Sequence, residues 1–467
     1  MVIIESNNKN KYVYDNLTGQ IFFVSDSSSA QNVVKYYHNK LNITDSVCNN
    51  IELYKVSSGD VKQYLIGEAN GFRQLILEVT SACNLRCRYC IYSEHYNLTR
   101  THGNEMMSFD IAKKAIDYYF QNFEIMFERN PMRKPIIGFC GGEPLVNFEL
   151  IKKSVKYISE NYRRNRVLYN ITTNGILLDD KVQNFLVDNN FSILVSLDGS
   201  KEMHDRNRVD KFNNGTFDRI KTNLDNFSKK YPSHMLSLSV CFDYKTDMVE
   251  LGKFIDSLPY RAVTITKVAS ENTDYYSQFS EKDERNFFNS LDQFKKNFYK
   301  AVEDNDQERS IFAYTYFNAI FGDFAFHPMV GESSPKIRPF TGTCIPGEKI
   351  YVDVNGKYKV CEKINSSFDI GDINCGIDFE SSARILEEYN RTIAEHCNKC
   401  QVSRLCKQCF RHFLSESGFS KSDNNCAQQK RAIISTLTDY VNLLENDPKL
   451  FERVTTDYFK FISSIGE

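Results

Sequence analysis

The chain has 467 residues, of which 41% are hydrophobic and 25% charged, with a formal net charge of -2. This length predicts roughly two to four domains, and near-neutrality argues against a nucleic-acid partner held by a general positive field. No apolar run approaches the ~20 residues of a membrane span, and the first one, Val2-Ile3-Ile4, is too short for a secretory signal. We expect a cytoplasmic protein without a membrane partner.

Residues 1–72 carry a pattern of their own. The run from Tyr12 to Val24 predicts two short strands around an Asn/Thr/Gly turn, and Ser29 to Lys40 predicts a helix. Strand-like residues follow at Ile51 to Lys55 and at Gln63 to Ile66. This order predicts a small winged-helix-like domain, although an extension that only covers the next domain has the same pattern.

Strand-like and helix-like segments then alternate six times. The expected strands are Gln74 to Thr80, Pro135 to Cys140, Val167 to Thr172, Ser192 to Leu197, Leu236 to Phe242 and Ala262 to Val268. The expected helices are Phe109 to Glu128, Glu149 to Asn161, Lys181 to Asp188, Thr216 to Lys229, Met248 to Ser257 and Glu281 to Glu303. Such alternation favours parallel strands joined by right-handed crossovers, so the fold class is α/β, with a partial (βα)6 barrel over 73–303.

Cys83, Cys87 and Cys90 follow the first strand in one tight loop. In a reducing compartment, fourteen cysteines favour metal binding or catalysis over disulfides. Three thiolates around one volume suit a cubane iron-sulfur cluster with one open iron. A closed zinc site needs four ligands, and His95 and His102 lie outside the tight spacing. Three unrelated buried thiols are the remaining alternative. Small buried residues are expected at Cys48, Cys140, Cys241 and Cys375.

Unusual residues follow the next three strands, at the edge of a parallel sheet where ligands gather. They are Gly141-Gly142-Glu143-Pro144, then Thr173-Asn174-Gly175, then Ser196-Leu197-Asp198-Gly199. Glycines let a backbone approach a ligand closely, and Glu143 is able to take a cationic amine. The same residue types also dominate ordinary turns.

Together with the cysteine loop, these motifs resemble the radical S-adenosylmethionine (SAM) enzymes. The resemblance implies a [4Fe-4S] cluster whose open iron is chelated by the amino and carboxylate groups of SAM, and which cleaves SAM to a 5′-deoxyadenosyl radical when reduced. It places Tyr89 near the adenine, and Gly141, Gly142 and Glu143 at the methionine amine. By the same resemblance, the SAM ribose or carboxylate would be held by Asn174, Ser196 and Arg208. His204 and Asp205 are either a proton-transfer pair or, as we prefer, structural.

Beyond a bridge at 304–343, which has an aromatic helical stretch from Ile311 to Phe326, seven more cysteines follow. Lys349 to Val360 predicts a hairpin around Asn355-Gly356, which delivers Cys361 near Cys344. The remaining cysteines are Cys397, Cys400, Cys406, Cys409 and Cys426. On their own, the two close CxxC pairs fit zinc and iron-sulfur equally well.

In this chain, the pattern resembles the SPASM domain, which extends radical SAM enzymes and holds two auxiliary [4Fe-4S] clusters. Gly356 lies five residues before Cys361, as that pattern requires, but Cys406 and Cys409 are one residue closer together than usual. No cysteine stands near Arg338, where an extra one often precedes. The resemblance implies one cluster on Cys344, Cys361 and Cys409 and a second on Cys397, Cys400, Cys406 and Cys426. The first then has an iron open to a substrate thiolate, unless Cys375 or another residue fills it.

The resemblance as a whole implies a radical SAM/SPASM peptide maturase that installs a cysteine thioether of the sactipeptide or ranthipeptide type in a ribosomal precursor peptide. Glu362 is then either a general base or a solvated residue. The N-terminal domain would bind the leader of the precursor, and a ferredoxin or flavodoxin would supply electrons. Formylglycine formation on a sulfatase, a carbon-carbon crosslink and a zinc-binding scaffold remain as alternatives. The expected order is a leader-recognition domain at 1–72, the barrel, the bridge, a SPASM domain at 344–430 and a C-terminal helix at 431–467.

Overall fold

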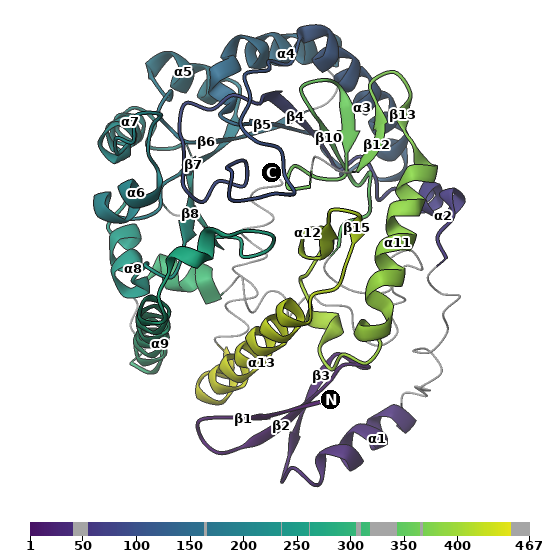
Figure 1. Cartoon of the computed structure of the whole chain (residues 1–467), viewed down its shortest axis with the longest axis vertical. Coiled ribbons are helices and arrows are strands. Elements are labelled where there is room, and N and C mark those ends of the chain that lie inside the picture. Colours follow the sequence, from purple (N-terminus) through teal and green to yellow (C-terminus); the bar gives the residue numbers. More distant parts are fainter. Residues whose placement is uncertain are drawn as a thin grey trace.

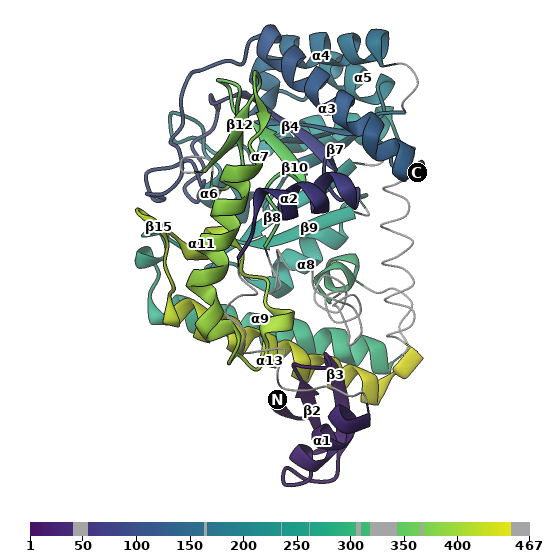
Figure 2. The ribbon, with the colours of Figure 1, turned by 90° about the vertical axis from the view of Figure 1, so that its right-hand side faces the viewer.

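The computed structural model describes residues 1–40, 55–162, 166–234, 236–260, 262–304, 310–317, 343–364 and 368–449. A curved central sheet has helices along its outer side, while the C-terminal region lies across its open side (Figure 1). A small N-terminal sheet sits at the far end of the molecule, beside the last helix (Figures 1 and 2). In the described part of the chain, no helix is long and apolar enough to cross a membrane.

Six parallel strands form the barrel part of the main sheet. They are β4 (Gln74–Thr80), β5 (Ile136–Gly141), β6 (Leu168–Thr173), β7 (Phe191–Ser196), β8 (Leu236–Phe242) and β9 (Ala262–Lys267), in that spatial order. All six strand predictions are confirmed. Leu75, Leu77 and Val79 belong to the core beneath the outer helices, so Glu78 between them faces the barrel interior.

The outer helices are α3 (Phe109–Arg129), α4 (Phe148–Asn161), α5 (Asp180–Asp188), α6 (Lys201–Asn207), α7 (Phe217–Lys230), α8 (Met248–Asp256) and α9 (Glu281–Glu303). Capping residues set several of their starts. The side chains of Ser108, Asp179 and Asp247 accept hydrogen bonds from the first turns of α3, α5 and α8. All predicted helices of the barrel are confirmed, while the short helix α6 was not predicted.

The C-terminal region extends the same sheet. Strand β10 (Lys349–Val352) lies parallel to β4, with Tyr351 opposite Ile76, and the order continues outward through β11 (Lys357–Lys359), β12 (Asp369–Asp372) and β13 (Gly376–Ile377). The predicted hairpin of β10 and β11 is confirmed, and Gly356 in its turn has a φ of 83°. The elements that follow are α11 (Phe379–Cys397), α12 (Phe410–Phe413), β14 (Leu414–Ser415), β15 (Gly418–Phe419) and α13 (Asp423–Asn446).

Only 310–317 and 343 of the bridge lie within the described residues. Residues 311–317 are helical. Phe312 and Phe317 of this segment pack against Phe294 of α9, as the aromatic pattern predicts. The rest of the predicted helix, up to Phe326, lies outside the described residues.

The N-terminal region begins with an antiparallel sheet of β1 (Val2–Glu5), β2 (Lys11–Asp15) and β3 (Gln20–Val24), followed by α1 (Ala30–Lys40). The hairpin and helix predictions are confirmed, and β1 was missed. Val2, Ile4 and Tyr14 are buried against residues of α13. This contact places the N-terminal sheet on the C-terminal helix rather than on the barrel (Figure 2).

The structure differs from the prediction in one element of the N-terminal region and in the start of the last helix. The second predicted strand, Gln63 to Ile66, is wrong: α2 (Ser58–Lys62) continues as the π-helix η3 (Gln63–Gly67), in which Tyr64 donates a hydrogen bond to Glu348 (2.6 Å). This part of 1–72 therefore contacts the start of β10 instead of the N-terminal sheet. Most of the other predicted strand, Ile51 to Lys55, lies outside the described residues. The last helix begins at Asp423, before the expected boundary at 431.

Candidate functional site

The loop after β4 brings three sulfur atoms together. Burial raises the pKa of the Cys83 thiol to about 12 and raises those of Cys87 and Cys90, and charge on Cys90 raises the pKa of both Cys83 and Cys87. Two backbone amides point at sulfur, from Leu85 to Cys83 (3.4 Å) and from Tyr92 to Cys90 (3.5 Å). One buried and two partly buried thiols with amide donors fit an iron-sulfur cluster, in which metal binding removes the thiol protons.

Glu143 is a buried carboxylate close to this loop, with 1% of its surface exposed. Its Oε1 accepts hydrogen bonds from Thr173 Oγ1 (2.7 Å) and Leu145 N (3.1 Å), and its Oε2 accepts one from Asn174 N (2.7 Å). Burial raises the pKa of Glu143 to about 7, although these donors oppose the rise. The carboxylate is thus held rigidly, and a cationic partner would favour its ionised form.

The two glycines before Glu143 allow a close approach of two chain segments. A Cβ at Gly141 would lie 2.2 Å from Thr80 O, and one at Gly142 would lie 2.3 Å from Ala82 O. The expectation was a close approach to a ligand. In the structure, it is the backbone entering the cysteine loop that occupies the space.

Asn174 links the end of β6 to the cysteine loop. Its Nδ2 donates a hydrogen bond to Asn84 Oδ1 (2.7 Å) and lies 3.9 Å from Cys83 Sγ. Ser196, at the end of β7, is 8% exposed. Both residues lie at the carboxyl edge of the sheet, where the sequence places them.

Arg208 is held at the carboxyl edge of the sheet by contacts with neighbouring side chains. Its Nε donates a hydrogen bond to Asp198 Oδ2 (2.8 Å), its guanidinium lies 5.4 Å from the ring centroid of Tyr89, and its Nη1 is 3.9 Å from Cys87 Sγ. The Tyr89 hydroxyl also donates to Asp198, and Cys241 N donates to Asp198 Oδ1 (3.0 Å). Asp198 therefore positions Tyr89 and Arg208, two of the residues predicted to contact SAM. This role was not predicted, because Asp198 lies in a segment with the composition of an ordinary turn.

His204 and Asp205 do not pair with each other. His204 Nδ1 accepts a hydrogen bond from Asp198 N (3.3 Å), and its Nε2 lies 3.1 Å from Thr216 Oγ1. Asp205 accepts hydrogen bonds from Thr216 N (2.7 Å) and Phe217 N (2.8 Å) at the start of α7. Burial lowers the pKa of His204 to about 4. The contacts agree with the structural interpretation of this pair.

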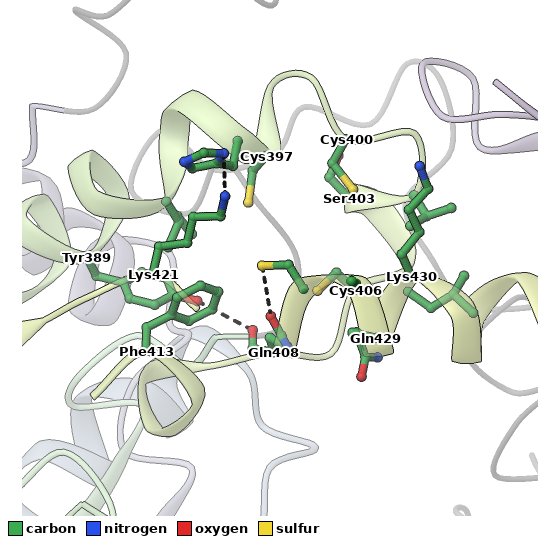
Figure 3. Close-up of a pocket in the computed structure, with 16 residues that line it drawn as sticks. Tyr389, Cys397, Cys400, Ser403, Cys406, Gln408, Phe413, Lys421, Gln429 and Lys430 are labelled. Carbon is green, nitrogen blue, oxygen red and sulfur yellow. Dashed lines mark hydrogen bonds between the residues drawn. The ribbon is translucent and has the colours of Figure 1, made fainter. Parts of the chain in front are cut away.

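Four of the C-terminal cysteines line one cavity of about 340 Å³, shown in Figure 3: Cys397, Cys400, Cys406 and Cys426. Cys397 ends α11, Cys426 lies in the first turn of α13, and the loop between these helices carries the other two. Lys421 also lines this cavity, with its Nζ 2.6 Å from His396 Nδ1. A cavity of this size with four sulfur donors fits a cluster of the cubane type.

The other three C-terminal cysteines come from three segments. Although Cys344 is exposed as a residue, desolvation of its thiol raises its pKa, and negative charges on Glu348, Cys409 and Glu362 raise it further. Cys361 Sγ lies 3.4 Å from Glu362 Oε2, and Cys409 Sγ lies 3.6 Å from His412 Nδ1. His412, which the sequence analysis did not single out, also accepts a hydrogen bond from Cys409 N (3.0 Å).

Glu362 lies between this group and the SAM loop. The hydroxyl of Tyr92, two residues after Cys90, donates a hydrogen bond to the backbone oxygen of Glu362 (3.3 Å). Tyr92 also packs under the guanidinium of Arg100, which pairs with the buried Glu78 in the barrel interior. The backbone at Glu362 is therefore joined to the loop that follows Cys90, while its carboxylate lies beside Cys361.

The cysteines outside these groups differ in their surroundings. Cys140 and Cys241 are partly buried at the ends of β5 and β8, and Cys48 lies outside the described residues. Cys375 is exposed in the turn between β12 and β13, so the prediction of a buried residue there is wrong.

Comparison with known proteins finds chains and structures that are similar to this one. Residues 77–255 match the family model described as the Radical SAM superfamily. The chain is 33% identical over 152 residues to a cysteine-type anaerobic sulfatase-maturating enzyme of Clostridium novyi, a match that covers 32% of this chain and 38% of the relative. It is 25% identical over 361 residues to an enzyme of the same name from Clostridium perfringens, covering 71% of this chain and 87% of the relative.

The first relatives are matched over a minor part of their length. A serine-type anaerobic sulfatase-maturating enzyme of Bacteroides thetaiotaomicron is 30% identical over 174 residues, which cover 37% of this chain and 40% of the relative. A solved structure, native anSMEcpe with bound AdoMet, superposes with a TM-score of 0.58 at 20% identity, over 82% of this chain and 99% of that chain. Residues 77–255 are thus similar to the Radical SAM superfamily, and the fold is similar to that of native anSMEcpe.

Proposed function

We propose that the protein is a radical SAM/SPASM peptide maturase that forms a cysteine thioether in a ribosomal precursor peptide. The observation that carries the proposal is that one fold holds the three-cysteine loop beside Glu143 and two further cysteine groups, with Glu362 between them. A structure of the same fold, anSMEcpe, carries AdoMet together with a peptide named Cp18Cys, which supports a peptide substrate.

Cys83, Cys87 and Cys90 would hold a [4Fe-4S] cluster, which supplies the reductive cleavage of SAM that yields the 5′-deoxyadenosyl radical. Glu143 would bind the methionine amine through its ionised carboxylate. Its hydrogen bonds to Thr173 and Asn174 fix the carboxylate before SAM arrives, so binding costs little reorganisation.

The remaining contacts of SAM would come from the neighbouring strand ends. Tyr89 would lie against the adenine, and Asn174, Ser196 and Arg208 would bind the ribose or the carboxylate. Because Asp198 fixes the guanidinium of Arg208 at Nε, the other guanidinium nitrogens stay directed toward the cysteine loop.

Glu362 would act on the peptide. Joining a carbon radical to a cysteine thiol requires loss of the thiol proton, which the carboxylate of Glu362 would accept, and loss of one electron, which would pass to an auxiliary cluster. Cys344, Cys361 and Cys409 would hold an auxiliary [4Fe-4S] cluster with one iron open to the substrate thiolate. The second auxiliary cluster would lie in the cavity of Cys397, Cys400, Cys406 and Cys426. A ferredoxin or flavodoxin is the expected electron donor.

The leader of the precursor would bind to the N-terminal sheet as an added strand. Strand β3 lies at an edge of that sheet, where its backbone is open to pairing. Phe23 on this strand is 62% exposed, and Tyr36 on the adjacent α1 is 60% exposed. An open strand edge beside exposed aromatic side chains suits an extended peptide.

The first test measures metals and SAM cleavage together in the anaerobically reconstituted protein. About twelve irons per chain, with 5′-deoxyadenosine released only when a reductant is present, are expected for three cubane clusters. Zinc without iron would leave a zinc-binding scaffold as the function. About four irons with bound zinc would retain SAM cleavage and remove the auxiliary clusters.

Formylglycine formation is the second candidate, favoured by the match to 87% of the Clostridium perfringens enzyme. Assays with peptide substrates distinguish thioether formation from formylglycine formation. A precursor encoded beside this gene should lose two hydrogens and its alkylatable thiol if a thioether forms, whereas a carbon-carbon crosslink would leave the thiol alkylatable. A sulfatase-derived cysteine peptide that gains a hydrazine-reactive aldehyde would instead establish the formylglycine activity.

A further inference from the structure

The N-terminal sheet is seated directly on the loop that carries two cysteines of the cavity in Figure 3. Asn16, in the turn between β2 and β3, donates a hydrogen bond from Nδ2 to Ser403 Oγ (2.9 Å) and accepts one at Oδ1 from Arg404 N (3.1 Å). Ser403 and Arg404 stand between Cys400 and Cys406. The side-chain amide of Asn16 thus binds this cysteine loop through both its nitrogen and its oxygen.

A shared hydrophobic cluster backs these hydrogen bonds. It joins Val2, Ile4 and Tyr14 of the sheet to Val402 and Leu405 of the loop and to Ile433, Leu437 and Val441 of α13. Cys400 and Cys406 pack against this cluster. Val402 and Ile433 also line the cavity itself, so the same side chains form the cavity wall and the seat of the sheet.

The far end of the sheet is fixed to the same helix that begins beside the cavity. Asn7 N donates to Asn442 Oδ1 (2.7 Å), and the Tyr12 hydroxyl donates to Glu445 Oε1 (2.7 Å). Helix α13 runs without interruption from Cys426, in its first turn, to these contacts near its end. A change in the position of its first turn is therefore transmitted along a rigid element to the sheet.

We infer that the metal centre held by Cys397, Cys400, Cys406 and Cys426 anchors the N-terminal sheet, so that the sheet is in place only when this centre is loaded. The inference rests on the proposed function for the cluster itself and for the leader-binding role of the sheet. Ligand binding to a folded site stabilises that fold by mass action. Here the stabilised loop and helix are the platform on which the sheet rests.

A consequence is that loss of this one centre releases the sheet while the barrel keeps its fold. The platform belongs to the loop at 400–406 and to α13, whereas the barrel core is built on β4–β9 and their outer helices. An enzyme that lacks the centre should then cleave SAM but should no longer hold the leader close to the barrel.

The test is hydrogen-deuterium exchange, followed by mass spectrometry, on the full-length reconstituted protein. In the double variant Cys400→Ser/Cys406→Ser, the amides of Val2–Val24 and of the second half of α13 should exchange at least tenfold faster than in the parent protein. Cys344→Ser, which removes a cysteine from the other auxiliary group, is the matched control and should leave both segments protected. Reductant-dependent cleavage of SAM reports that the barrel is folded in each variant.

A second variant approaches the contact from the sheet side. Asn16→Ala removes both hydrogen bonds to the loop, and it should raise exchange in Val2–Val24 while the iron content and SAM cleavage stay unchanged. Loss of about four irons in Cys400→Ser/Cys406→Ser without faster exchange at the sheet would overturn the anchor. Equal iron in the parent protein and this double variant would instead overturn the assignment of the second auxiliary cluster.

Discussion

Arg208 and Asp198 form a buried ion pair, with Nε of the guanidinium 2.8 Å from Oδ2 of the carboxylate. Their side chains are 8% and 3% exposed. Since Tyr89 donates to the same carboxylate, one residue fixes both the aromatic and the cationic group beside the cysteine loop. The proposed SAM site thus depends on a residue that holds two of its side chains in place.

Removal of this charge should destabilise the protein. Asp198→Asn keeps the size of the side chain but leaves the guanidinium of Arg208 buried without its counter-ion, which is expected to cost about 3 to 5 kcal/mol. Thermal unfolding of the reconstituted protein measures this change. The exposed pair of Lys201 and Asp218 provides the control, because Asp218→Asn should cost less than about 1 kcal/mol. Equal effects of the two variants would contradict the structural role of Asp198.

The affinity for SAM should depend on the ionisation of Glu143. Glu143→Gln removes the negative charge that faces the methionine amine, and binding should weaken about tenfold to a hundredfold, as for a charged hydrogen bond. Equilibrium binding of SAM to the reconstituted protein measures the effect. The exposed Glu149 is the control, and Glu149→Gln should bind SAM like the parent protein.

The raised pKa of Glu143, about 7 instead of 4.5, also predicts the direction of the pH dependence. SAM affinity should fall as pH drops below about 7, because the carboxylate then becomes protonated, and this dependence should be absent in Glu143→Gln. The ionisation of Glu143 affects the stability of the fold in the opposite direction from SAM affinity. The group favours the folded state most at pH values below 4.5, and this contribution is lost as pH rises through about 7. A SAM affinity that is independent of pH between 5 and 8 in the parent protein would argue against the role of Glu143.

Glu362 should be needed for the peptide step and not for the cleavage of SAM. Glu362→Gln should release 5′-deoxyadenosine from SAM at nearly the parent rate without peptide, and should lower the yield of modified peptide by about a hundredfold or more, the usual contribution of a general base. Product analysis by mass spectrometry in the same reaction separates the two steps. The control is Glu380→Gln at the exposed first turn of α11. If Glu362→Gln modified the peptide normally, the base would have to lie elsewhere.

Cys344 should carry iron although its side chain is exposed. Cys344→Ser is expected to lower the iron content by about four atoms per chain and to remove one reduced-cluster signal from the electron paramagnetic resonance spectrum. The control is Cys375→Ser, at another exposed cysteine, which should leave the iron content and the spectrum unchanged. A loss of iron in Cys375→Ser would show that this cysteine completes the first auxiliary centre.

The barrel could be predicted because period and length agree in every unit. Each strand is a short run with aliphatic or aromatic residues at most of its buried positions, and each helix has a capping residue or a clear apolar face, so local and global preferences coincide. Gln63 to Ile66 was wrong for the opposite reason. Tyr64, Leu65 and Ile66 are a short apolar run that fits a buried strand and a buried helical turn equally well. The turn is favoured by the hydrogen bond from Tyr64 to Glu348 and by the preceding helix α2, which packs against α11.

The site was less predictable than the fold. Motif spacing places Cys83, Glu143 and Asn174 at one edge, but the partners of Arg208 come from β7 and from the cysteine loop, and no local pattern links them. The contact between the N-terminal sheet and the loop at 400–406 was also not predictable from the sequence. Asn16 and Ser403 are far apart in sequence, and each has the composition of an ordinary turn.

Because β10 pairs with β4, the cysteine loop after β4 and the cysteine-rich C-terminal region are attached to the same hydrogen-bonded strand pair. Cys83 follows β4 and Cys361 follows the hairpin of β10, and the parallel register between Ile76 and Tyr351 sets how far apart they stand. A shift of that register by one residue would turn Tyr351 to the other face of the sheet. The C-terminal region is therefore held in one fixed position against the cysteine loop for as long as β10 pairs with the edge of β4 in this register.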